Sequence, residues 1–256
     1  MILLLDIGNS RSKAAWFDGH QIWPGPAVDA AIAMEQLVGQ LAAAGHTPDQ
    51  VCVSNVRGRR LAADLRAAVR ERWGLEPGFA VTRAESKLLR NGYVDHRQLG
   101  VDRWLAMLAA RRRHAGEPLC VVDAGTAVTV DLIDPLGSHL GGFIVPGIES
   151  MADVLRRRSG EIARLETPVE SPDSMTGPGR STASAVRSGA VQAVAGLVDR
   201  ALTMLPGGSG SARLLLTGGD AGALARLLDR ADVCPWLVFE GLLIDTGLNM
   251  NFGATD

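Results

Sequence analysis

Short apolar runs separated by polar turns predict that strands and helices alternate along the first half of the chain. Two longer stretches place apolar residues three or four positions apart, the spacing of an amphipathic helix. We expect strands at 2–6, 11–17, 21–23, 50–55 and 78–82, and helices at 30–44 and 59–73. The third strand should stop at Pro24, because proline has no N–H for a sheet. This order predicts a mixed α/β lobe.

The second half of the chain repeats the opening of the first: three strands and then a helix. We expect strands at 119–123, 128–134, 140–145 and 213–217, helices at 148–158, 182–205, 221–228 and 238–249, and a loop at 166–180. A helix at 101–113 would connect the halves. The repeated order predicts an ancestral duplication, with an N-terminal lobe at 1–113, a C-terminal lobe at 114–256 and a cleft between them.

Two turns that follow apolar strands resemble each other, LLLDIGNS at 3–10 and CVVDAGTA at 120–127. A glycine after a buried strand lets the backbone approach a ligand closely, and successive N–H groups can then point at phosphate oxygens. The carboxylates of Asp6 and Asp123 would repel phosphate unless a cation lies beside them. A single such turn could simply close a hairpin, but two matched copies favour a phosphate-binding role.

The composition favours small-molecule chemistry inside the cell. With 256 residues and 46% hydrophobic content the chain can bury a large core, and a net charge of -2 gives no basic field for nucleic acid. Three isolated cysteines and no apolar run of about 18 residues predict a cytoplasmic protein without a leader or membrane span. The arginine runs at 111–113 and 156–158 are expected to be solvated or to face helix dipoles.

Five motifs in order resemble those of type III pantothenate kinases. They are DIGNSRSK at 6–13, GVDR at 100–103, DAGTAVTVD at 123–131, GGFIVPG at 141–147 and TGGDA at 217–221. The resemblance implies a duplicated ribonuclease H-like α/β fold with a central interlobe cleft, as in acetate and sugar kinases, heat-shock ATPases and actin. It also implies ATP-dependent phosphorylation of pantothenate to 4'-phosphopantothenate, which opens coenzyme A biosynthesis. Ser10 replaces a usual threonine, and the hydroxyl is retained.

The resemblance also implies roles for individual residues. Asp102 would be the general base, although a carboxylate in the first turn of a helix could equally be a structural cap. Asp123 would bind potassium or ammonium, and Asp6 would serve magnesium, acting through water. The residues implied for ATP are Asp6, Ile7, Gly8, Asn9, Ser10, Arg11, Ser12, Lys13 and Thr126, and those implied for pantothenate are Tyr93, Gly100, Val101, Asp102, Arg103 and Thr182.

The same resemblance implies a homodimer whose acceptor pocket lies near the subunit interface, which would let Thr182 act across subunits. Neither lysine, Lys13 or Lys87, follows the glycine pattern of a Walker A loop, so a P-loop route to phosphate binding is excluded. No nucleic-acid or membrane partner is expected. Two alternatives remain open: an accessory transcription factor without catalysis, and a kinase of the same fold for another small alcohol.

Overall fold

The computed structural model describes residues 1–158 and 177–247. The chain divides into two compact units. The first contains Met1–Leu88, Tyr93–Arg113 and the chain from Trp236 onward, and the second contains Leu89–Gly92 and His114–Pro235. The C-terminal helix, expected in the second lobe, therefore belongs to the first unit. Among the described residues no helix is both long and apolar enough to cross a membrane.

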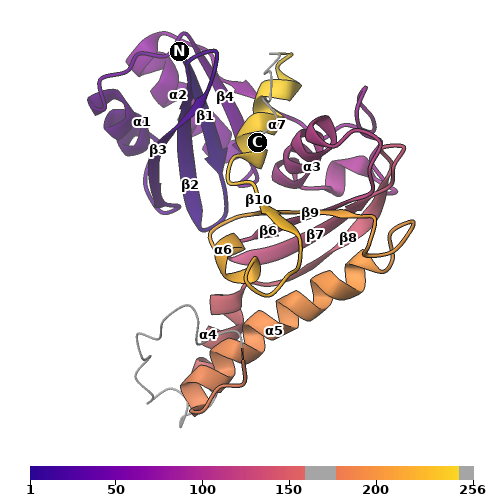
Figure 1. Ribbon diagram of the computed structural model, residues 1–256. Helices are drawn as coiled ribbons and strands as arrows, with labels where there is room; N and C mark the ends of the chain where they lie inside the picture. Colours follow the sequence, from indigo (N-terminus) through magenta and orange to yellow (C-terminus); the bar gives the residue numbers. More distant parts are fainter. Residues whose placement is uncertain (159–176, 248–256) are drawn as a thin grey trace. The chain divides into compact units, whose positions relative to one another are not determined.

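The first unit is built on a five-stranded sheet in the order β3-β2-β1-β4-β5 (Figure 1). Its strands are β1 (Ile2–Ile7), β2 (Arg11–Phe17), β3 (Ile22–Asp29), β4 (Gln50–Asn55) and β5 (Gly78–Phe79). Because side chains alternate across a strand, Leu3, Leu5 and Ile7 share one face of the sheet. They form a buried core with helices α1 (Met34–Ala43) and α2 (Arg59–Trp73).

Two further helices of the first unit pack closely against each other. They are α3 (Val101–Arg113), preceded by the short 3₁₀ helix η1 (His96–Gln98), and α7 (Leu237–Asp245). Gly241 permits the approach, since a Cβ there would overlap the main chain of Leu105. Arg113 donates to Glu240 through Nε at 2.8 Å and through Nη2 at 2.5 Å. The end of the arginine run is thus a bidentate ion pair rather than a solvated face.

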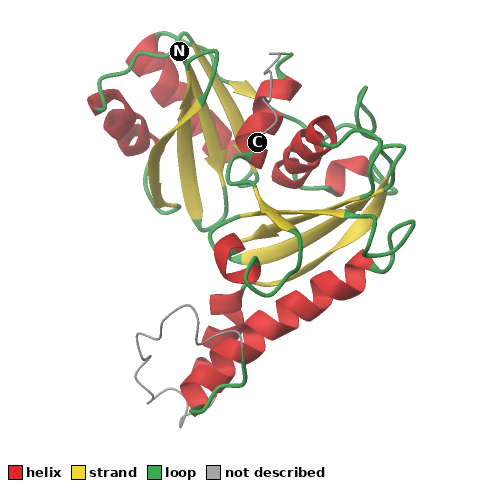
Figure 2. Cartoon of the chain, viewed as in Figure 1, coloured by secondary structure: helices red, strands yellow, loops and turns green. Residues whose placement is uncertain are grey.

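The second unit repeats the architecture with a sheet in the order β10-β9-β6-β7-β8. Its strands are β6 (Leu119–Ala124), β7 (Ala127–Ile133), β8 (His139–Pro146), β9 (Arg213–Thr217) and β10 (Ala231–Val233), and its helices are α4 (Ile148–Arg158), α5 (Thr182–Leu202) and α6 (Ala221–Leu224). Apolar residues of β6, β7 and β9 form one core with α5 and α6. Figure 2 shows helices beside the strands of each sheet.

The two sheets have the same topology. In each sheet the first three strands form two consecutive antiparallel hairpins. The fourth strand pairs parallel with the first, and the fifth pairs parallel with the fourth. The pairings of β6 to β10 follow the same scheme. This repetition confirms the duplicated fold expected from the sequence.

Several predicted boundaries were wrong. Strand β3 continues through Pro24 to Asp29, and it can do so because it is an edge strand, where a missing N–H removes no essential sheet bond. The following helix begins only at Met34, since the Asp29 side chain first closes a turn by accepting from the N–H of Ala31. Strand β5 is shorter than expected, and β10 was not predicted. Residues 166–176 of the expected loop and 248–249 of the expected last helix lie outside the described residues.

Candidate active site

The first phosphate turn joins β1 to β2 through Gly8, Asn9 and Ser10. The N–H of Gly8 donates to the carbonyl of Arg11 at 3.0 Å, and a Cβ on Gly8 would lie 2.9 Å from that oxygen. Glycine is therefore required for the tight approach of the two strands. Asn9 and Arg11 are exposed and Ser10 is half-buried. The turn thus presents polar groups at its surface, as a phosphate-binding loop must.

The residues around this turn divide between the two faces of the sheet. Asp6 pairs in register with Lys13, so their side chains lie on the same face, and both are half-buried. Ile7 pairs with Ser12, and both of these side chains are fully buried. Any contact that Ile7 and Ser12 make with a nucleotide must therefore come from their main chains.

The second phosphate turn joins β6 to β7 through Gly125 and Thr126. The N–H of Gly125 donates to the carbonyl of Ala127 at 3.1 Å. The carbonyl of Thr126 accepts from the N–H of Gly147 at 2.8 Å and from Ser150 Oγ at 2.9 Å. These bonds tie the turn to the start of α4 and leave the Thr126 residue itself exposed.

Asp123, just before this turn, lies against Gly218. Gly218 has a φ of +92°, a conformation that residues with a Cβ rarely adopt, and a Cβ there would lie 2.5 Å from Asp123 Oδ1. The cross-strand neighbours of Asp123 are Thr129 and Thr217. A carboxylate is thus set among hydroxyl-bearing residues at the end of a strand.

These oxygen-rich surroundings fit hard cations such as magnesium and potassium. The described residues contain no group of three or more histidine, cysteine or acidic side chains that could hold a metal. Magnesium in kinases is commonly held by one or two carboxylates together with the phosphates of the substrate. Asp6 in the first unit and Asp123 in the second each offer one carboxylate that could take part in such a site.

Five of the six residues expected to bind the acceptor, all except Thr182, lie in the first unit. Arg103 is buried, its Nη1 donates to the hydroxyl of Tyr93 at 2.9 Å, and its guanidinium carbon lies 5.6 Å from the centre of the Tyr93 ring. Asp102 Oδ1 accepts from the N–H of Arg103 at 2.8 Å. A Cβ on Gly100 would lie 2.5 Å from the same oxygen, so glycine makes room for the carboxylate.

A carboxylate, a guanidinium and a phenol at the start of one helix can bind a ligand that carries both an anionic group and a hydroxyl. The positive end of the α3 dipole adds to the attraction for negative charge. Val101 differs from its neighbours, because its side chain is buried at 8% exposure and belongs to the packing of the unit.

Thr182 is exposed and begins α5 in the second unit. The preceding residue, Ser181, forms a capping box with Ser184, in which each side chain accepts from the backbone N–H of the other. The structure does not place Thr182 with the acceptor residues of the first unit, and its role stays a prediction.

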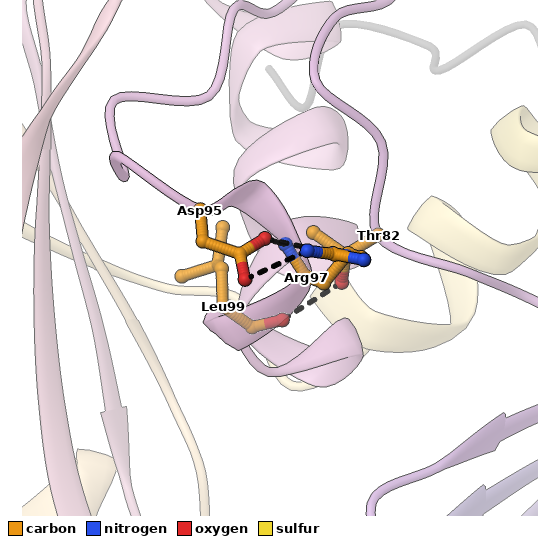
Figure 3. A network of polar contacts seen from close by, with 4 residues as sticks. All are labelled: Thr82, Asp95, Arg97 and Leu99. Carbon is orange, nitrogen blue, oxygen red and sulfur yellow. Dashed lines mark hydrogen bonds and ion pairs between the residues drawn. The ribbon is translucent and has the colours of Figure 1, made fainter.

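Two residues around these sites carried no recognisable signal in the sequence. Thr82 donates from Oγ1 to the carbonyl of Leu99 at 2.9 Å, directly before GVDR (Figure 3). Ser150 supports the second turn, as described above. Both act on main-chain carbonyls of residues far away along the chain, so no local motif could have revealed them.

Solved structures identify the class of fold. The chain matches a Campylobacter jejuni protein described as a Baf family transcriptional activator, with a TM-score of 0.60 and 24% identity. The match covers 96% of this chain and 98% of that protein. A Sinorhizobium meliloti protein described as a 2-dehydro-3-deoxygalactonokinase matches with a TM-score of 0.57 and 16% identity, covering 100% of this chain and 98% of the other. At these identities the matches show the fold alone, the duplicated ribonuclease H-like fold of sugar kinases.

Sequence comparison defines the family within that class. The profile of type III pantothenate kinases matches residues 2–203. A type III pantothenate kinase from Alkalilimnicola ehrlichii is 39% identical over 253 residues, which cover 94% of this chain and 95% of the relative. The chain belongs to the type III pantothenate kinase family.

Proposed function

We propose that this protein is an ATP-dependent pantothenate kinase that forms 4'-phosphopantothenate, the first step of coenzyme A biosynthesis. The observation that carries the proposal is the family match over nearly the whole chain. The contact between Tyr93 and Arg103, beside Asp102, supports it, because these residues offer the groups that an anionic alcohol requires.

In this proposal Asp102 is the general base. It accepts the proton of the primary hydroxyl of pantothenate as that oxygen attacks the γ-phosphorus of ATP, and ADP leaves. Arg103 binds the pantothenate carboxylate or the oxygen of its one amide group, and its bond to Tyr93 holds the guanidinium in place. Gly100 and Val101 complete the acceptor side, and Thr182 contributes a further hydroxyl across the subunit interface.

The two phosphate turns hold ATP in this proposal. The N–H groups of residues 8–13 and the side chains of Asn9, Ser10, Arg11 and Lys13 contact the phosphates, and Thr126 contacts them as well. Magnesium, when bound, neutralises charge on the phosphates, and Asp6 orients it through water. Asp123 holds potassium or ammonium beside the second turn. Phosphoryl transfer depends mainly on such positioning and charge neutralisation.

We further propose that the protein works in the cytoplasm as a homodimer with pantothenate as its only substrate besides ATP. The compartment is supported by the cysteines, since Cys52, Cys120 and Cys234 are all free and buried. The dimer follows from the family resemblance.

The test is a coupled assay of ADP release from purified protein with ATP, magnesium, potassium and pantothenate. We expect turnover with pantothenate and none above background with acetate or simple sugars. A preference for one of those other acceptors would point to a kinase for another alcohol. A protein inactive on every acceptor and under every cation would instead fit a binding role without catalysis.

The base assignment is tested by Asp102→Asn. The amide keeps the shape of the side chain but cannot accept the proton, so kcat should fall by about a hundredfold to ten-thousandfold. Asp95→Asn, in the same segment, is the matched control and should keep most of its activity. Near-normal kcat in Asp102→Asn, with an unchanged urea midpoint, would rule out Asp102 as the base.

A further inference from the structure

The start of α3 shows how its first N–H groups are satisfied. The N–H of Trp104 makes the first regular helical bond, to the carbonyl of Gly100 at 3.1 Å. The N–H of Arg103 donates to Asp102 Oδ1 at 2.8 Å. Arg103 is one of the first four residues of this helix start, whose N–H groups have no partner within the helix. The carbonyl of Leu99, directly before GVDR, accepts from Thr82 Oγ1 at 2.9 Å (Figure 3).

The residue that holds Leu99 is itself tied to the framework of the first unit. Its neighbour Arg83 forms an ion pair through Nη1 with Asp245 Oδ1 at 2.9 Å, and the Asp245 side chain is only 7% exposed. Burial raises the pKa of Asp245 above its ordinary value, and the Arg83 charge opposes that rise. Thr82 and Arg83 therefore link the end of α7 to the residue before GVDR.

Helix α7, at the other end of this link, is itself packed against α3. Helix α7 packs on α3 at Gly241, and Glu240 pairs with Arg113 at the far end of α3. Helix α3 is thus held by α7 at Leu105 and Arg113, and Thr82 anchors the residue directly before GVDR. Asp95 and Arg97 stabilise the neighbouring η1, through bonds of Arg97 Nε and Nη2 to the Asp95 carboxylate at 2.9 and 3.2 Å (Figure 3).

We propose that Thr82 is a positioning residue for phosphoryl transfer: its hydroxyl anchors the Leu99 carbonyl directly before GVDR and so fixes the backbone from which the Asp102 and Arg103 side chains project. This inference rests on the proposed function. The bond fixes the backbone directly before GVDR, and the N–H of Arg103, which has no partner within the helix, orients the Asp102 carboxylate. Thr82 touches neither substrate in this scheme and acts only through the backbone.

The test compares Thr82→Val, which removes the hydroxyl at nearly constant shape, with Thr82→Ser, which keeps it. Thr82→Val should lower kcat/KM for pantothenate by about tenfold, while the KM for ATP stays unchanged. Thr82→Ser should restore kcat/KM to within about twofold of the wild type. Thr203→Val is the matched control, since it removes a similar hydroxyl bond, to the carbonyl of Arg200, in the second unit. It should leave every constant unchanged.

Hydrogen exchange of the amides at 99–104 provides a readout that does not need activity. Thr82→Val should exchange these amides faster than the wild type, and Thr82→Ser should not. Equal kinetics in Thr82→Val and wild type would overturn the inference, as would equal loss in the valine and serine variants or unchanged exchange at 99–104. If wild-type protein does not phosphorylate pantothenate, the proposed function fails, and the exchange comparison still decides whether Thr82 anchors the start of α3.

Discussion

The two sheets have the same topology, but the side chains beside their equivalent Asp residues differ. Both place an Asp near the end of the first strand, Asp6 in β1 and Asp123 in β6. Asp6 lies opposite Lys13 and Ser54, whereas Asp123 lies opposite Thr129 and Thr217. The first repeat thus sets an ammonium group beside its carboxylate, and the second sets two hydroxyl residues there. Duplication kept the scaffold, and the side chains at equivalent positions diverged.

The turns that follow these strands diverged as well. Gly8, Asn9 and Ser10 separate β1 from β2, but only Gly125 and Thr126 separate β6 from β7. The carbonyl of Thr126 in the shorter turn accepts from Gly147 and Ser150 at the start of α4, whereas the carbonyl of Ser10 in the longer turn accepts from the N–H of Ala30, after β3. The two turns are therefore braced by different segments.

The largest effects should come from neutralising the two carboxylates in turn. Asp6→Asn should raise the magnesium concentration needed for half-maximal rate by about 10–100-fold, the usual cost of losing an outer-shell ligand partner. Asp123→Asn should abolish stimulation by potassium or ammonium. Titrations of each cation against ADP release check both results, and Asp134→Asn serves as the control. Identical changes in both variants would show that the two repeats do not divide the cations.

An intermediate effect is expected in the fourth strand of each sheet, β4 and β9. One residue of that strand lies opposite the Asp, Ser54 in β4 and Thr217 in β9, and the repeats differ in the residue that follows it. The register makes Asn55 and Gly218 equivalent. Gly218→Ala should destabilise by about 1–3 kcal/mol, because the new Cβ would meet Asp123 at a φ that alanine disfavours. Asn55→Ala should cost about 1 kcal/mol, through lost bonds to the N–H of Arg57 and the carbonyl of Gly58.

Urea unfolding midpoints measure both changes, with Gly222→Ala as the matched control, since a Cβ on Gly222 meets nothing within 4 Å. A Gly218→Ala variant as stable as the wild type would remove the steric argument for glycine in the second repeat.

The smallest effect concerns the second hairpin of each repeat, which an Asp closes in both cases. Asp134 accepts from the N–H groups of Leu136 and Ser138. Asp18 accepts from the N–H groups of Gln21 and His20 and also from Trp23 Nε1 at 3.0 Å. The Gln21 bond is the main cause that lowers the pKa of Asp18 from 3.8 to about 2, with Trp23 and His20 adding to it.

Because the folded pKa of Asp18 lies below the unfolded one, its ionised form stabilises the protein above pH 3.8, and that contribution is lost as the pH falls through about 2. As the pH falls from 3.8 to about 2, the free energy of unfolding of Asp18→Asn should therefore decrease less than that of the wild type. Thermal midpoints between pH 2 and 5 measure the difference, and Trp23→Phe should give an intermediate curve. Parallel curves for wild type and Asp18→Asn would contradict the assignment.

Strong apolar periodicity made several elements predictable to the residue. Helices 59–73, 101–113 and 148–158 and strand 213–217 have the predicted bounds. Predicted bounds were wrong where contacts with other segments determine where an element begins or ends. Strand β3 passes through its prolines because it lies at the edge of the sheet, and a turn closed by Asp29 delays the start of α1. Residue types alone cannot show which strand is at an edge.

The candidate site was predictable where chemistry lies in short motifs. The motif residues Asp102 and Arg103 are adjacent in sequence, and the structure brings Tyr93 to Arg103. The supporting contacts were not predictable. Thr82 lies 17 residues from Leu99, and Glu240 lies 127 residues from Arg113. Such contacts depend on how helices α3 and α7 pack.

The sequence by itself determined the family, the duplicated order of strands and helices, and the two glycine turns, because these depend on local spacing and residue type. Only the tertiary structure decided that the C-terminal helix joins the first unit, that Gly218 makes room for Asp123, and that Thr82 holds the start of α3. These features arise from close packing between distant segments, and close packing is a property of the folded chain rather than of any stretch of it.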